Sequence, residues 1–188
     1  MVPQTPDDSA LTAAARGGEL AAFNQLVERY QGVVYNLCLR MLGDPSSAED
    51  AAQEAFFAAY RSIKSYRGGA FRGWLLRIAA NQCYDALRHR QRHHTQILSD
   101  EPLVPDPSPL PDDLALSREA ISTLERAIAH LAPEQRLCVL LIDVQGLDYE
   151  EAAQAIGANL GTVKSRLSRA RAHLRELLGP EFRLKGGE

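Results

Sequence analysis

The sequence predicts an all-α protein of two small helical domains, and three observations support this. Apolar residues recur at spacings of three and four in both halves of the 188-residue chain, which is the pattern of a one-sided helix. β-branched residues are sparse and do not alternate with polar ones, so strands are not supported. Half of the ten prolines fall within 102–111 among acidic residues, which predicts a flexible, extended acidic linker. The expected domains are therefore 10–93 and 119–179, with the linker at 94–118.

The first domain is expected to contain three main helices. An apolar stripe over residues 23–41 predicts the first helix, which Gly43 helps to end. Ser46, with Glu49 three residues later, predicts a capping box at the start of the second helix. A third helix is expected to begin near Arg72, after two consecutive glycines.

The second domain is expected to contain four helices. A helix over 117–131 ends before a proline, and that proline is the expected first residue of a helix over 133–145. A capping box at Asp148 and Glu151 predicts a short third helix. Asn159 is the expected N-cap of a long final helix. The inward residues of that helix are expected to be Leu160, Val163, Leu167, Ala170, Leu174 and Leu177.

The formal net charge of −3 hides a strong segregation of charge along the chain. Residues 61–93 carry eight lysines and arginines against one acid, Asp85, and residues 162–175 carry five with no acid. Each block projects a local positive field that suits nucleic acid, although a basic run is also typical of a solvated helix face.

Other classes of function lack support in the sequence. The three cysteines lie among apolar residues without a C-x-x-C pair, and His89 with His93 lacks a third metal ligand, so no metal is expected. Common catalytic and nucleotide-binding motifs are absent, so neither an enzymatic activity nor a cofactor is expected. The sequence contains no apolar run that could span a membrane and no signal segment, which favours a cytoplasmic location.

The most specific pattern is a helix-turn-helix, formed by the short helix at 149–156, the turn at 157–159 and the final helix. Arg and Lys reach phosphates or guanine edges, and Ser and Thr contact either, so such a helix suits the major groove of DNA. An exposed basic helix with no ligand is the alternative interpretation. The candidate DNA contacts are Thr162, Lys164, Ser165, Arg166, Ser168, Arg169 and Arg171.

The first basic block combines cations with aromatic and amide side chains. Four of its residues share one face of the expected third helix, at spacings of four, three and four: Arg77, Asn81, Tyr84 and Arg88. The preceding segment, 65–72, mixes aromatic and cationic side chains around two glycines, a composition that suits unstacked single-stranded bases. Core packing is the alternative for Phe71 and the favoured interpretation for Trp74.

The expected second helix has an acidic face. Asp50, Gln53, Glu54 and Phe57 cluster within about 100° of arc. The opposite side is apolar and carries Ala48, Ala52, Ala55, Phe56, Ala59 and Ile63. An acidic patch around one exposed phenylalanine is typical of a protein-docking surface, with a merely solvated face as the alternative.

Six segments together resemble a known family, and they occur in order over most of the chain: 23–27, 48–56, 71–81, 131–136, 149–153 and 161–171. The first three resemble region 2 and the last three region 4 of bacterial RNA polymerase sigma factors, in the extracytoplasmic-function (ECF) group of the sigma-70 family. The resemblance is specific because all six segments are present at natural spacing.

The resemblance implies that core RNA polymerase and promoter DNA are the partners. Asp50, Gln53 and Glu54, with Phe57 beside them, would engage the coiled coil of the largest polymerase subunit. The final helix would read the minus-thirty-five element as duplex through the seven residues named above. The minus-ten element would be melted, and one flipped base captured, by a larger set: Lys64, Tyr66, Arg67, Phe71, Arg72, Arg77, Asn81, Tyr84 and Arg88.

The resemblance further implies that an anti-sigma factor is a common kind of partner and that the linker stands in for an RNA-like segment in the polymerase cleft. Some relatives carry an aromatic residue where this chain has Ser168, so a promoter sequence does not transfer. A stand-alone helix-turn-helix regulator is the runner-up, but such regulators normally read two half-sites as dimers. A nucleic-acid enzyme is the third hypothesis, and the carboxylate or metal constellation that it needs is missing.

Overall fold

The computed structural model describes residues 7–94 and 112–179, with the side chains of 7–92 and 121–179, and within these residues it contains helices and no strand. The helices are α1 (Asp8–Arg16), α2 (Leu20–Leu42), α3 (Pro45–Ser62), the 3-10 turn η1 (Ile63–Ser65), α4 (Phe71–His94), α5 (Asp112–Ala129), α6 (Pro133–Val139), the π turn η2 (Leu140–Val144), α7 (Tyr149–Ile156) and α8 (Leu160–Leu178). The predicted all-α class is confirmed.

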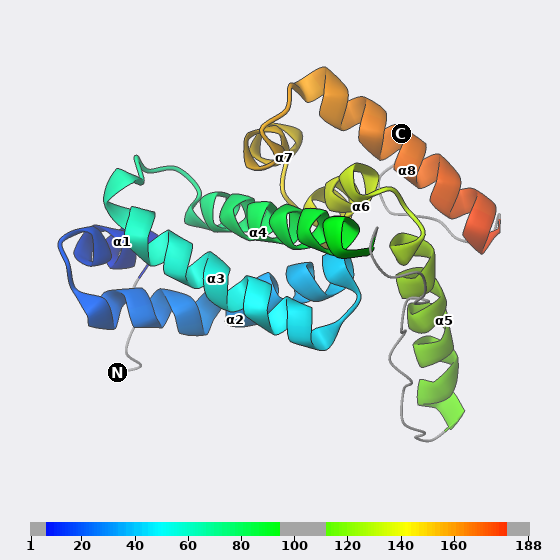
Figure 1. Cartoon of the computed structure of the whole chain (residues 1–188), viewed down its shortest axis with the longest axis horizontal. Coiled ribbons are helices and arrows are strands. Elements are labelled where there is room, and N and C mark those ends of the chain that lie inside the picture. The colour runs from blue at the N-terminus through cyan, green and yellow to red at the C-terminus, as the bar shows by residue number, and fades with distance from the viewer. Residues whose placement is uncertain (1–6, 95–111, 180–188) are drawn as a thin grey trace.

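The N-terminal half is a bundle in which α2, α3 and α4 lie side by side and α1 packs across one end of α2 (Figure 1). The inner faces of these helices bury the residues that the three-and-four pattern predicted, including Leu26, Val34, Leu37 and Met41. On α3 the inner face is made of alanines, so α2 and α4 can approach it closely. The acidic face of α3 is left outward.

The start of α3 differs from the predicted capping box. The N-cap is Asp44, whose carboxylate accepts a 2.7 Å hydrogen bond from the backbone N–H of Ser47, and Pro45 is the first helical residue. The hydrogen bond to Ser47 lowers the pKa of Asp44. Ser46 therefore lies inside the helix, because Pro45 has no N–H to lose and favours the first position.

The C-terminal half begins earlier than predicted. α5 starts at Asp112, inside the segment 94–118 that the sequence assigns to the linker. The proline run at 102–111 lies outside the described residues. Beyond the last of those prolines, the sequence through 129 has the apolar spacing of a helix, which explains the earlier start.

The helix starts of α6, α7 and α8 confirm their predicted caps. Pro133 is the first residue of α6, and Asp148 with Glu151 forms a complete capping box on α7. The side chain of Asn159 accepts a 2.8 Å hydrogen bond from the N–H of Thr162 at the start of α8. One inward assignment is wrong: Leu177 is 45% exposed, and the next residue, Leu178, packs against the core instead.

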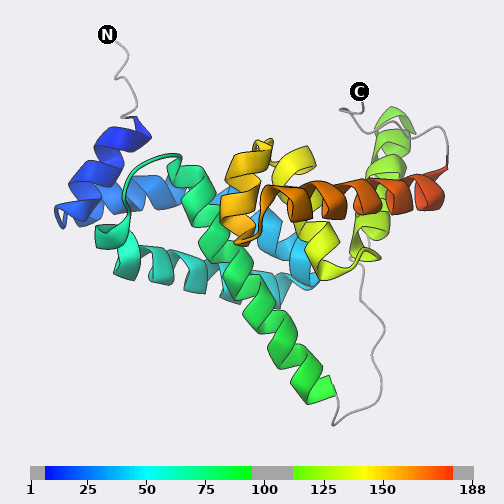
Figure 2. The same cartoon turned by 90° about the horizontal axis from the view of Figure 1, so that it is seen from above.

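The two halves are in contact in this structure. α7 packs on α4, as Figures 1 and 2 both show, and α5 and α6 touch α2. A guanidinium nitrogen of Arg72 donates a 2.7 Å hydrogen bond to Oε1 of Gln145. Arg136 in the C-terminal half donates a 2.7 Å hydrogen bond to the carbonyl of Met41 in the N-terminal half. The halves therefore share a buried boundary.

Candidate nucleic-acid interface

The helix-turn-helix is built by strong local signals. α7 ends at Gly157, which adopts a left-handed conformation with φ 71° that a residue with a side chain rarely takes. The chain then turns directly into the Asn159 cap of α8. Val163 and Leu167 on the inner face of α8 are buried, so the opposite face of the helix must point outward.

The outward face of α8 carries most of the residues predicted to read duplex DNA. Lys164, Ser165, Ser168 and Arg169 are exposed, whereas Thr162 and Arg166 are half-buried. The ammonium of Lys164 lies 5.7 Å from the centre of the Tyr149 ring, so a cation–π contact anchors it to α7. Four polar side chains on one outer helix face form a surface that fits a major groove.

Arg171 is placed differently from the other predicted contacts on α8. Its guanidinium forms two hydrogen bonds to the carboxylate of Asp143, of 2.5 and 3.2 Å, and both side chains are largely buried. Hydrogen bonding to Asp143 raises the pKa of Arg171. The contact ties α8 to the end of η2, so this arginine holds the domain together rather than facing outward.

The segment between η1 and α4 forms a fixed loop, residues 66–70, supported from below by aromatic rings. Gly68 and Gly69 have φ of 94° and 98°, and the Tyr66 hydroxyl donates a 2.6 Å hydrogen bond to the carbonyl of Gly69. The ring of Tyr66 lies 5.8 Å from that of Phe71 and 5.2 Å from that of Trp74. Burial raises the pKa of Tyr66 above its ordinary value.

This arrangement separates the predicted aromatic contacts from the cationic ones. Phe71 and Tyr66 are buried, at 3% and 6% exposure, and Trp74 is partly buried in the same cluster. Their rings form the floor of loop 66–70 and not an exposed stacking platform. Lys64 and Arg67, by contrast, are exposed on either side of Tyr66.

The four residues predicted to share a face of α4 do so, but their surroundings differ. Arg77 and Asn81 are exposed, and Arg88 forms a 3.0 Å ion pair with Asp85 at the surface. Tyr84 is half-buried at the boundary with the C-terminal half, and burial raises its pKa to about 12.

A cavity of about 360 Å³ lies between the loop and α7. Arg67, Trp74 and Arg77 line it from the N-terminal half, and Glu151 and Gln154 line it from α7. The basic surface predicted to bind the melted strand therefore faces an acidic helix of the same chain.

The predicted docking residues on α3 lie together on an open surface. Asp50, Gln53 and Glu54 are exposed, and Phe57 is 57% exposed. A groove of about 590 Å³ between α3 and α4 is lined by Asp50 and Glu54 on the α3 side, and a second groove of about 430 Å³ lies on the α2 side. α3 therefore forms a ridge between two grooves.

Two features of the site were missed by sequence reasoning. α1 was not predicted as a separate helix, although its run of alanines is a helix signal. The boundary residues Arg136 and Gln145 carry no local signal, because their partners lie far away in the chain. Among the described residues, no group of three or more His, Cys, Asp or Glu is placed to bind a metal. None of the helices in the described ranges has the length and apolarity that a bilayer crossing requires.

Comparisons with known proteins agree with this geometry. The family model described as Sigma-70 region 2 matches residues 26–93, and the model described as Sigma-70, region 4 matches residues 121–174. The chain is 38% identical to the ECF RNA polymerase sigma factor SigE of Mycolicibacterium smegmatis, covering 85% of this chain and 62% of the relative. It is also 38% identical to the ECF RNA polymerase sigma factor SigM of Mycobacterium tuberculosis, covering 92% of this chain and 85% of the relative.

Two solved structures are similar over nearly the whole chain. One is the sigma factor RpoE in complex with the anti-sigma factor NepR from Bartonella quintana, with a TM-score of 0.70 at 27% identity, covering 85% of this chain and 98% of that one. The other is CnrH in complex with the cytosolic domain of CnrY, with a TM-score of 0.66 at 29% identity, covering 91% of this chain and 96% of that one. The chain therefore belongs to the sigma-70 family, as an RNA polymerase sigma factor of the ECF group.

Proposed function

We propose that this sigma factor joins core RNA polymerase through α3 and directs transcription from promoters that it reads with two separate surfaces. It would do so in the cytoplasm and without catalytic activity of its own. The observation that carries the proposal is the outward face of α8, on the second helix of a fully capped helix-turn-helix. The family match favours this function over a stand-alone regulator.

The polymerase contact is proposed for the ridge of α3. Asp50, Gln53, Glu54 and Phe57 combine negative charge with an exposed aromatic ring, and interface anchors are commonly aromatic residues ringed by polar ones. The Glu54 carboxylate lies 3.9 Å from the guanidinium of Arg61, but both side chains are well exposed. Such a pair is weak, so Glu54 remains available to a cationic partner.

The minus-ten element is proposed to bind along loop 66–70 and the outward face of α4. Lys64, Arg67, Arg77 and Asn81 are exposed there, and Arg72 and Arg88 are held by Gln145 and Asp85. The exposed cations suit the backbone of a melted strand, while the amide of Asn81 suits a base edge. We assign Tyr66 and Phe71 of the predicted set to the support of the loop, since their rings are buried, and Tyr84 to the boundary between the halves.

The minus-thirty-five element is proposed to bind α8 through Lys164, Ser165, Ser168 and Arg169, with Thr162 and Arg166 at the edges. Arg171 is excluded from this set, because its guanidinium is held by Asp143.

The contact between the halves partly closes the surface proposed for the minus-ten element. α7 covers part of the surface assigned to the melted strand, with Glu151 facing the cavity that Arg67 and Arg77 line. The two surfaces therefore need to separate before both can bind DNA, and core polymerase would bind the separated state better. We further propose that an anti-sigma factor binds this chain, because the similar sigma factor RpoE forms a complex with the anti-sigma factor NepR.

The experiment is in vitro transcription with core polymerase, combined with charge reversal on α3. The wild-type chain should give specific transcripts from a cognate promoter, and Asp50→Lys with Glu54→Lys should weaken its binding to core polymerase by roughly tenfold or more. Glu28→Lys is the matched control, because Glu28 is an exposed acid on α2 outside the ridge. Equal core affinity for the α3 variant and the control would remove the docking assignment.

A further inference from the structure

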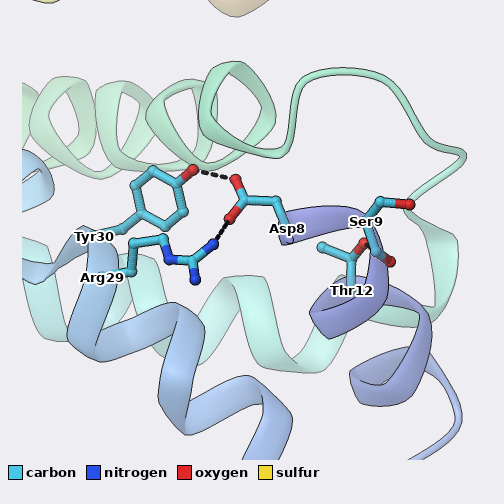
Figure 3. A network of polar contacts seen from close by, with 5 residues as sticks. All are labelled: Asp8, Ser9, Thr12, Arg29 and Tyr30. Carbon is cyan, nitrogen blue, oxygen red and sulfur yellow. Dashed lines mark hydrogen bonds and ion pairs between the residues drawn. The ribbon is translucent and has the colours of Figure 1, made fainter. Parts of the chain in front are cut away.

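One carboxylate of the short helix α1 makes polar contacts with the bundle. Asp8, in the first turn of α1, accepts hydrogen bonds from the Tyr30 hydroxyl and the Arg29 guanidinium of α2, as Figure 3 shows. Burial, together with the hydrogen bond to Asp8, raises the pKa of Tyr30 to about 12. Leu11 and Ala15 bury the inner face of the same helix. The Tyr30 side chain is thus held at both its ring and its hydroxyl.

A chain of ring contacts leads from Tyr30 to loop 66–70. The Tyr30 ring lies 5.6 Å from the ring of Phe71, and Phe71 lies 5.8 Å from Tyr66. Tyr66 in turn holds the carbonyl of Gly69 by its 2.6 Å hydrogen bond. The position of the loop backbone is therefore linked to Asp8 through three aromatic side chains.

α1 also forms a wall beside the loop. A cavity of about 390 Å³ lies between them, lined by Ser9 and Arg16 of α1 and by Gly68 and Gly69 of the loop. The cavity against α7 is lined by residues of both halves, whereas the cavity against α1 is lined by residues of the N-terminal half alone. In the separated state proposed above, α1 and the aromatic floor would therefore hold the loop in place.

We propose that Asp8 is a positioning residue for the capture of an unpaired promoter base, acting through Tyr30 and Phe71 on loop 66–70. This inference rests on the proposed function, because it assumes that the loop receives the melted strand. Capture of a single flipped base requires a loop that is already in its binding geometry, since every residue ordered during binding reduces affinity. Asp8 supplies that order without touching the DNA.

The test uses the full chain with core polymerase on a promoter whose minus-ten element is already unpaired by mismatches. A 2-aminopurine replaces the candidate flipped base, and its fluorescence reports capture. Asp8→Ala removes the acceptor, and Tyr30→Phe removes only the hydroxyl while keeping the ring. Glu28→Ala is the matched control, because it removes one exposed carboxylate of α2 that lines neither cavity beside the loop.

Tyr30→Phe should weaken capture by roughly five- to tenfold, the range expected for one hydrogen bond. Asp8→Ala should weaken it at least as much, because it also removes the acceptor of Arg29. The double variant should be no weaker than Asp8→Ala, since both changes break the same link. Affinity for core polymerase and for a duplex minus-thirty-five fragment should stay unchanged in all variants, which a general loss of folding would not allow.

Capture by Asp8→Ala and Tyr30→Phe equal to that of Glu28→Ala would overturn the inference, as would a loss confined to thermal stability. If Asp8→Ala does not fold, base capture by Tyr30→Phe alone tests the inference. A wild-type chain that gives no specific transcript and captures no base would overturn the proposed function and this inference with it. Specific transcription with unaltered capture in both variants would overturn the inference alone.

Discussion

Arg136 of α6 donates a 2.7 Å hydrogen bond from its guanidinium to the backbone carbonyl of Met41, across the boundary between the two halves. The same guanidinium also donates to the carbonyls of Ala129, the last residue of α5, and of Leu131 in the turn that follows. One side chain therefore satisfies carbonyls from both halves at once. This links the stability of the C-terminal half to its contact with the N-terminal half.

Replacing Arg136 by Met should loosen this boundary. The substitution keeps an apolar stem of similar length but leaves the carbonyl of Met41 without its donor, so the free energy of unfolding should fall by about 1–3 kcal/mol. The radius of gyration from small-angle X-ray scattering should rise. Arg126→Met is the control, since Arg126 is exposed and donates to Thr123 within its own helix. An unchanged radius for Arg136→Met would argue against the linkage.

Alkaline pH should favour separation of the halves through Tyr84. The folded, closed state raises the pKa of this hydroxyl to about 12 from an unfolded value near 10. A raised pKa means that the contribution to stability is complete below pH 10 and is lost as the pH rises from about 10 to 12.

Absorbance titration of tyrosinate can check this directly. Tyr30 lies within the N-terminal half and its pKa is also raised to about 12, so it serves as an internal reference. Tyr84→Phe should remove one of the late-titrating tyrosines, which also include Tyr30 and Tyr66. Binding to core polymerase should move the pKa of Tyr84 toward 10 and leave the pKa of Tyr30 unchanged. Identical titration of both tyrosines in the free and polymerase-bound chain would contradict the proposed opening.

Arg171→Ala should destabilise the C-terminal half before it affects DNA binding. The change leaves the Asp143 carboxylate buried without its cation, and breaking a buried pair of this kind costs about 3–5 kcal/mol. Urea unfolding measures the loss. Arg175→Ala, one turn further along α8 and exposed, removes the same charge and should cost little. A stable Arg171→Ala protein with weakened DNA affinity would return Arg171 to the DNA-contact set.

Lys164→Ala and Arg169→Ala should each weaken binding to the minus-thirty-five element by about 1–3 kcal/mol if these side chains read bases. Binding assays of the holoenzyme over a panel of substituted elements would show relaxed preference at one position for each variant. A loss of affinity that is uniform over the panel would assign the residue to phosphate contact. The slope of log affinity against log salt concentration should then fall in magnitude by about one. Arg175→Ala again controls for charge alone.

The sequence predicted what depends on local signals. The caps at Asp148 and Asn159, Pro133 at the start of α6, and the buried face of α8 as far as Leu174 are all recognisable within a few residues, because capping and helix periodicity act over one or two turns. The predicted N-cap of α3 was two residues too late, because Asp44 and Ser46 are both good cap residues. Pro45 favours the first helical position, which makes Asp44 the N-cap.

The sequence could not predict what depends on distant partners. Arg72 and Gln145 are 73 residues apart and Arg136 and Met41 are 95 apart, so no local pattern reveals either contact. Arg171 looked like its neighbours on a basic helix, and only the fold brings Asp143 against it. The aromatic residues around loop 66–70 were ambiguous in a similar way. Phe71 belongs to a segment whose composition suits base stacking, but its side chain is buried like that of a core residue.

The most direct measurement is footprinting of one promoter carrying both elements, with and without core polymerase, at equal concentrations of this chain. With core polymerase, both the minus-ten and the minus-thirty-five elements should be protected together. The free chain should require a concentration on the order of 100-fold higher, because its two surfaces are not held at a fixed separation. Joint protection of both elements by the free chain at the holoenzyme concentration would contradict the account.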